Sequence, residues 1–151
     1  MNPSLRALFD QIATTPDFFE MPFTDVNEAN CTGDNALHCV AAWGDLEAAR
    51  LLVEAGVAVN KYGDLGHTPL HQACAFGHIE LVKFLVASGA DLHAHADGDL
   101  PFTAARLGGH DAICDYLSPL MLEAQAKDRH VYIKSRINQL KREIARLEAQ
   151  L

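Results

Sequence analysis

The chain has 151 residues, enough for one domain of ordinary size and too few for two. Hydrophobic residues make up 49% of it, so it can bury a core, but no apolar run approaches the roughly 18 residues of a membrane span. The net charge of −8 is uneven: residues 120–151 carry +3 and the remainder carries −11. An acidic body argues against nucleic-acid binding and favours a basic partner surface. The first residues lack the basic and apolar regions of a secretory signal, so we expect a cytoplasmic protein without membrane contact.

Residues 1–33 are expected to form a degenerate N-terminal capping unit. Four apolar residues at helical spacing predict a first helix, namely Leu5, Leu8, Phe9 and Ile12. Pro16 interrupts this helix, because the residue before a proline avoids helical geometry. The aromatic residues that follow are predicted to pack in the core beneath the next unit: Phe18, Phe19 and Phe23.

Residues 34–63 show the first regular unit, with helices predicted near Ala36–Trp43 and Leu46–Glu54. Asn35 is placed to cap the first helix, since an asparagine side chain accepts from the free N–H groups of a first turn. Gly56 is placed to stop the second helix, because glycine enters the left-handed conformation without steric cost.

The pattern returns 33 residues later in residues 64–96, where Leu70-His71 repeats Leu37-His38, Gly77 repeats Gly44 and Gly89 repeats Gly56. Three motifs of this unit stand at fixed places: Thr68-Pro69-Leu70-His71, Gly77-His78 and Gly89-Ala90-Asp91. In motif and period the unit resembles the ankyrin repeat. The resemblance implies an all-α ankyrin-repeat solenoid in which His38 and His71 tie neighbouring turns together by hydrogen bonds.

A third, shorter unit is predicted at residues 97–118. It contains Pro101, but Leu100 stands where the capping side chain is expected and Thr103 stands where the earlier units have histidine. The start of this unit is therefore expected to be the loosest of the three repeats, which span about 34–63, 64–96 and 97–118.

Residues 119–151 are predicted to form a C-terminal helix of coiled-coil type. Its apolar residues are spaced 4, 3, 4, 3 and 4 apart, which is a heptad seam for self-association: Ile133, Ile137, Leu140, Ile144, Leu147 and Leu151. A parallel homodimer would place Arg136 against Lys141, whereas an antiparallel pair brings Lys134 near Glu148. We therefore favour an antiparallel pair, or a helix docked on its own solenoid.

The ankyrin resemblance implies a non-catalytic module that binds another protein through its loop tips and the inner face of its first helices. Matched position by position, the residues implied on the helices are Ala42, Trp43, Ala75, Phe76 and Leu107. Those implied on the loops are Asp34, Tyr62, Asp64, Leu65, His67, His95 and Asp97. Trp43 and Phe76 are equivalent positions one repeat apart and are expected to be exposed anchors of an acidic, aromatic-centred concave face.

Other function classes have weaker support. The sequence has no glycine-rich phosphate loop, HExxH or GxSxG, so we expect neither an enzyme nor a cofactor. The spacing of His67 and His71 is compatible with a pair of zinc ligands. No further ligand completes a known zinc-site spacing, so we predict no metal site. Two alternatives stay open: a scaffold dimerised through the C-terminal helix, and an inhibitor or immunity-type protein that occludes an enzyme or a toxin.

Overall fold

The computed structural model describes residues 3–148, apart from the side chains of residues 132, 135, 138, 139, 142, 143 and 145–148. Residues 1–117 and 118–151 form two compact units. The described residues contain seven α-helices and two short 3-10 helices but no strand, only two isolated bridges between single residues. The prediction of an all-α repeat fold is therefore confirmed.

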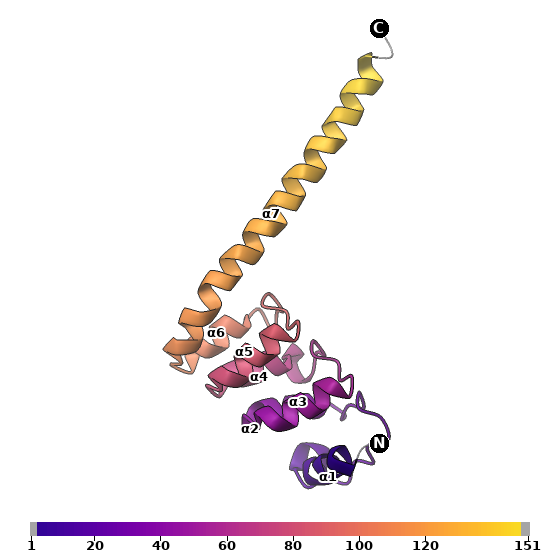
Figure 1. The fold of residues 1–151 in the computed structure, drawn as a ribbon, viewed down its shortest axis with the longest axis vertical. Coiled ribbons are helices and arrows are strands. Elements are labelled where there is room, and N and C mark those ends of the chain that lie inside the picture. Colours follow the sequence, from indigo (N-terminus) through magenta and orange to yellow (C-terminus); the bar gives the residue numbers. More distant parts are fainter. Residues whose placement is uncertain (1–2, 149–151) are drawn as a thin grey trace. The chain divides into compact units, whose positions relative to one another are not determined.

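The first unit is a succession of helix pairs (Figure 1). It begins with α1 (Pro3–Ile12) and the 3-10 helix η1 (Pro16–Phe18). The pairs that follow are α2 (Ala36–Trp43) with α3 (Leu46–Glu54), and α4 (Pro69–Ala75) with α5 (Ile79–Ala87), and between them lies the 3-10 helix η2 (Asp64–Gly66). The last pair is α6 (Pro101–Leu107) with the first turns of α7 (Asp111–Glu148). The first helices α2, α4 and α6 pack in one row, and α3 packs against α5 in a second row.

Local capping explains why the first regular pair has the predicted bounds. The Asn35 side chain accepts the N–H of Leu37 at 3.1 Å and so begins α2, as predicted. Gly44 ends α2 with φ of +75°, a conformation that favours glycine. In α4 the equivalent positions are Thr68 at the N-cap and Pro69 in the first turn. Leu100 begins α6 without a side-chain cap, in agreement with the prediction.

The core of the capping unit is aromatic. Phe9 stacks on Phe23 with ring centroids 4.5 Å apart, and Phe18 lies 5.8 Å from Phe23. All three are buried beneath the first pair of helices. The same prediction is wrong for Phe19, which is 68% exposed. Phe19 follows the last residue of η1, where the chain turns and carries this side chain away from the core.

Buried histidines join each repeat to the next, as the resemblance implied. In α4 the Nδ1 atom of His71 receives the N–H of Thr68 at 3.1 Å, and Nε2 lies 3.3 Å from the carbonyl oxygen of Asp99. Because Nδ1 accepts, Nε2 carries the proton and donates to the next repeat. His38 makes the equivalent contact with the carbonyl of His67 at 3.1 Å.

A second ladder of side chains joins the ends of the repeats. Asn27 donates to the carbonyl of Gly56 at 3.2 Å, and Asn60, 33 residues later, donates to the carbonyl of Gly89 at 2.9 Å. The next position in this ladder is His93. Its Nε2 is buried and has no hydrogen-bond partner within the described residues, so the asparagine ladder stops at the second repeat.

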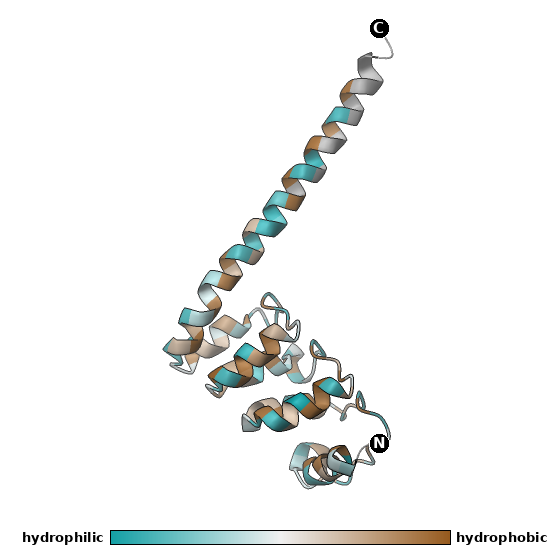
Figure 2. Ribbon diagram, viewed as in Figure 1, coloured by the Kyte–Doolittle hydropathy of each residue, from teal (hydrophilic) through white to brown (hydrophobic). Residues whose placement is uncertain are grey.

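The second unit is helical throughout its described part, because α7 extends to Glu148. Pro119 lies inside α7, so the helix does not end where the sequence pattern changes. A proline inside a helix removes one hydrogen bond and crowds the carbonyl four residues earlier, and α7 continues through Pro119 nevertheless. Apolar residues recur along a polar helix (Figure 2). Ile133, Ile137, Leu140 and Ile144 are each between 43% and 55% exposed. Leu147 and Leu151 of the predicted seam lie outside the described side chains.

No helix in the described part of the chain has the length and apolar character that a membrane crossing requires.

Candidate functional site

Two aromatic rings are exposed at the C-terminal ends of neighbouring first helices. Trp43, the last residue of α2, is 38% exposed, and Phe76, at the end of α4, is 57% exposed. The exposure predicted for them is confirmed. Neither ring belongs to the buried cluster that holds the repeats together.

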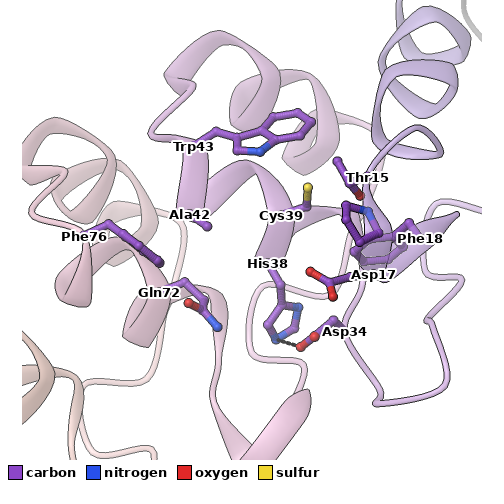
Figure 3. A pocket seen from close by; sticks show the side chains of 11 residues that line it. Thr15, Asp17, Phe18, Asp34, His38, Cys39, Ala42, Trp43, Gln72 and Phe76 are labelled. Atoms are coloured by element: carbon purple, nitrogen blue, oxygen red, sulfur yellow. Dashed lines mark ion pairs between the residues drawn. The ribbon is translucent and has the colours of Figure 1, made fainter.

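These rings border a pocket of about 340 Å³ on the row of first helices. Figure 3 shows Trp43 at the top, Phe76 and Gln72 to the left, and Asp17 and Asp34 together to the right. The pocket joins residues from three parts of the chain: Thr15 to Phe18 around η1, Asp34 to Trp43 around α2, and Gln72 with Phe76 from α4. Its volume is at the lower end of the range for ligand pockets, so it can receive one or a few side chains.

Histidines of the following repeats fix the helix ends that carry the aromatic rings. The Nε2 atom of His78 lies 3.0 Å from the carbonyl oxygen of Ala42, and His110 makes the same contact with Ala75. Each imidazole thus satisfies a carbonyl that the helix end leaves without a partner. The ring of His78 also stacks on Phe76, with centroids 6.4 Å apart.

The close approach of these histidines requires glycine at the helix ends. A Cβ on Gly44 would lie 2.4 Å from Nδ1 of His78, and a Cβ on Gly77 would lie 2.5 Å from Cε1 of His110. These two glycines therefore serve both the left-handed turn and the contact between repeats.

Two carboxylates lie on the acidic side of the pocket. Asp34 is held in place, because its Oδ1 accepts the N–H of Asp64 at 3.0 Å. The Thr32 hydroxyl lies 3.2 Å from its Oδ2 but closer, at 2.8 Å, to Oδ1 of Asn30. Asp17 is exposed on η1, and its carboxylate makes no hydrogen bond or ion pair within the described part of the chain. Its backbone carbonyl accepts from the side chain of Asn30 at 3.1 Å, which fastens η1 to the loop before the first repeat.

The innermost lining of the pocket is uncharged at neutral pH. Desolvation lowers the pKa of His38 below its ordinary value, although Asp34 opposes this effect with Oδ1 at 3.7 Å from Nε2 (Figure 3). Burial raises the pKa of the Cys39 thiol to about 11, so the thiol stays protonated. The net charge of the lining therefore comes from its two aspartates.

Most of the other predicted binding residues lie outside this pocket. The pocket brings together four of them, Trp43, Phe76, Ala42 and Asp34. The rest do not line it: Ala75, Leu107, Tyr62, Asp64, Leu65, His67, His95 and Asp97. Tyr62, Leu65 and Leu107 are exposed elsewhere, and Leu65 and Asp97 have positive φ of +51° and +50° at the tips of their loops.

Sequence reasoning missed the contribution of the capping unit. Pro16, Asp17 and Phe18 line the pocket through packing of η1, a long-range contact without a periodic signal. It also missed the contacts of His78 and His110 with the preceding repeats. A sequence signal for them existed, because Gly77-His78 recurs 32 residues later as Gly109-His110. His67 and His71 do lie close, with ring centroids 5.4 Å apart. Even so, no group of three or more potential metal ligands is found among the described residues.

A family model for ankyrin repeats (3 copies) matches residues 7–96 of the chain. The match covers most of the capping unit and the first two regular repeats, and every residue of the pocket lies within it. A search among curated proteins found no match. With more than half of its length matched and its helix pairs stacked at the repeat period, the chain belongs to the ankyrin-repeat family.

Proposed function

We propose that this protein is a non-catalytic binding module, located in the cytoplasm, that holds a partner protein on its inner face. By inner face we mean the surface of the first helices α2 and α4 together with η1 around the pocket. Ankyrin repeats generally mediate protein–protein interaction, and they supply the class of function. The inner face, with its acidic and aromatic residues, supplies the site.

One observation carries the proposal. Trp43 and Phe76 occupy equivalent positions in adjoining repeats, border one pocket and leave large parts of their rings in contact with solvent. Folding alone does not require this, because the buried residues of the same helices fill the core, among them Leu37, Val40, Leu70 and Ala73. Exposed aromatic residues that border a pocket are typical anchors of protein interfaces.

The charge of the body supports a basic partner. Residues 1–119 carry −11, and the pocket itself contains two aspartates and no lysine or arginine. A surface of one sign speeds the encounter with a surface of the opposite sign and disfavours partners of like charge.

Affinity capture with paired variants tests the proposal. Immobilised wild type and Trp43→Ala/Phe76→Ala are compared in native extract, with captured proteins identified by mass spectrometry. Leu122→Ala/Val131→Ala is the control, because these residues are 67% and 65% exposed on α7 and neither lines the pocket. A protein that wild type and control retain, and that the aromatic variant loses, supports the proposal. A partner that only the α7 variant loses would contradict it.

A second candidate function is a scaffold in which two copies pair through α7. The observation that favours it is the exposure of Ile133, Ile137, Leu140 and Ile144 at steps of 4, 3 and 4 residues. A helix of this kind is marginal in isolation and gains stability when the apolar seam is covered. We favour the antiparallel pair, because a parallel pair would place Arg136 against Lys141.

The scaffold is tested by the mass of the full-length protein in solution. Light scattering on wild type should give a dimer, and Ile137→Glu/Ile144→Glu should give a monomer. Val131→Glu is the matched control, since Val131 is exposed on the same helix but lies off the heptad seam. A monomeric wild type at high concentration would remove this candidate.

A further inference from the structure

We propose that the pocket between η1, α2 and α4 receives a single arginine side chain of the partner. The inference rests on the proposed function and narrows it, from a basic partner surface to one residue type in one place. In this arrangement the guanidinium lies against the ring of Trp43 and pairs with the carboxylate of Asp17.

The aromatic walls suit a flat cation. Trp43 and Phe76 both line the pocket, Trp43 at the top and Phe76 at the left of Figure 3, and each presents a partly exposed ring. A cation over an aromatic face is attracted by the ring electrons, most strongly over tryptophan. The planar guanidinium of arginine stacks on such a face, whereas the ammonium of lysine is compact and more strongly hydrated.

The carboxylates of Asp34 and Asp17 both favour a cation in the pocket, but they differ in how they would bind it. The N–H of Asp64 already engages Oδ1 of Asp34, so Asp34 supplies negative charge from a fixed position. The exposed carboxylate of Asp17 has both oxygens available, and a guanidinium can donate to the two of them at once. Asp17 is thus the group placed to pair with the arginine.

The rest of the lining fits this occupant. The side-chain amide of Gln72 makes no hydrogen bond within the described residues and faces the pocket opposite the aspartates (Figure 3). It can accept a further N–H of the guanidinium. His38 and Cys39 bring no positive charge to oppose a cation, because burial keeps the imidazole neutral and the thiol protonated. A space of about 340 Å³ holds one long side chain more readily than a helix or a loop.

The single tryptophan of the chain makes the test direct. The indole N–H of Trp43 gives one isolated signal in a proton–nitrogen NMR spectrum of the full-length protein. Three acetylated tripeptide amides of the form Gly-X-Gly are titrated to tens of millimolar at fixed ionic strength, with X as arginine, lysine or citrulline. Citrulline keeps the shape of arginine and removes its charge.

We expect a saturable shift of the indole signal with the arginine peptide, with affinity at least about tenfold above that of the citrulline peptide and above that of the lysine peptide. Asp17→Asn should weaken the arginine peptide about tenfold. Glu54→Gln is the matched control, because it removes one exposed negative charge on α3, away from the pocket, and should change the affinity little.

Equal affinity for arginine and citrulline peptides, or an arginine affinity unchanged in Asp17→Asn, would overturn the inference. So would the absence of any shift with the arginine peptide. The proposed function is judged separately, by whether Trp43→Ala/Phe76→Ala loses a captured partner. A partner lost by that variant, together with arginine peptides that do not bind, would mean that the inner face binds a different group.

Discussion

The Nε2 atom of His78 lies 3.0 Å from the carbonyl oxygen of Ala42, so the second repeat holds the helix end from which Trp43 projects. The same relationship joins His110 to Ala75, one residue before Phe76. The two aromatic residues of the candidate site therefore project from backbone that the next repeat fixes in place. A preorganised surface loses less entropy on binding than a mobile one.

Loss of the His78 contact should destabilise the fold. His78→Ala removes the donor to the Ala42 carbonyl and leaves that oxygen short of a partner, which costs about 1–2 kcal/mol of unfolding free energy. Urea denaturation measures the change. His95→Ala is the control, because His95 is exposed in a loop, and it should stay within about 0.5 kcal/mol of wild type. Equal stability of the two variants would contradict a structural role for His78.

Alanine substitutions at two glycines with nearly equal φ can distinguish the cost of backbone strain from the cost of a lost side-chain contact. Gly44 has φ of +75° and lies against His78, whereas Gly109 has φ of +73° and nothing within 4 Å of an added Cβ. Gly109→Ala should cost about 1–2 kcal/mol for the left-handed conformation alone. Gly44→Ala should cost clearly more, since the imidazole must move and release the Ala42 carbonyl. If urea denaturation gave equal losses of unfolding free energy for the two variants, moving the His78 ring would cost no measurable stability, contrary to this prediction.

Stability should fall as the pH drops below neutrality. Desolvation lowers the folded-state pKa values of His38 and His71 from the ordinary value of 6.5. Between 6.5 and the lowered values, the unfolded chain binds protons that the folded chain does not, so acid favours unfolding. For each histidine the slope approaches about 1.4 kcal/mol per pH unit, and the loss ends below the folded-state pKa.

Urea denaturation between pH 7.5 and pH 5 checks this dependence, and a flat profile would contradict it. In His71→Gln the slope should be smaller than in wild type. Its absolute stability at pH 7.5 should also fall, because His71 joins Thr68 to the carbonyl of Asp99.

Thiol labelling should distinguish the cysteines. Burial raises the pKa of Cys39 to about 11 and that of Cys74 to about 12, so both are protonated at pH 7.5 and poorly nucleophilic. Cys31 is exposed and should react first with iodoacetamide. Peptide mapping after a short exposure should find the label on Cys31, with less on the half-buried Cys39 and with the buried Cys74 modified only after unfolding. Early modification of Cys74 would contradict the packing of α4.

The aromatic rings should matter little for folding. Trp43→Ala/Phe76→Ala should lower the unfolding free energy by about 1 kcal/mol or less, because both rings are partly solvated and lie outside the buried cluster. A loss of about 3–5 kcal/mol, which is typical of aromatic residues deleted from a core, would assign them to the core instead.

The sequence predicts the repeats well because their signals are local. Asn35 begins α2 through its side-chain cap, and Gly44 ends it in a left-handed conformation. Such signals lie within a few residues of the helix and recur at the repeat period. The pocket could be predicted only in part, since Asp17 and Phe18 reach it by packing of the irregular capping unit. Phe19 and Phe18 are adjacent and equally apolar, and only the turn after η1 decides which is buried. Pro119 marks a change of pattern in the sequence, but α7 continues through it to Glu148.

The most direct test of the account is the dissociation constant of the captured partner, measured by titration calorimetry against wild type and against Trp43→Ala/Phe76→Ala. We predict that the variant binds at least about 30-fold more weakly, the equivalent of about 2 kcal/mol, while its fold is preserved. An unchanged dissociation constant would contradict the central claim and place the binding surface away from the inner face.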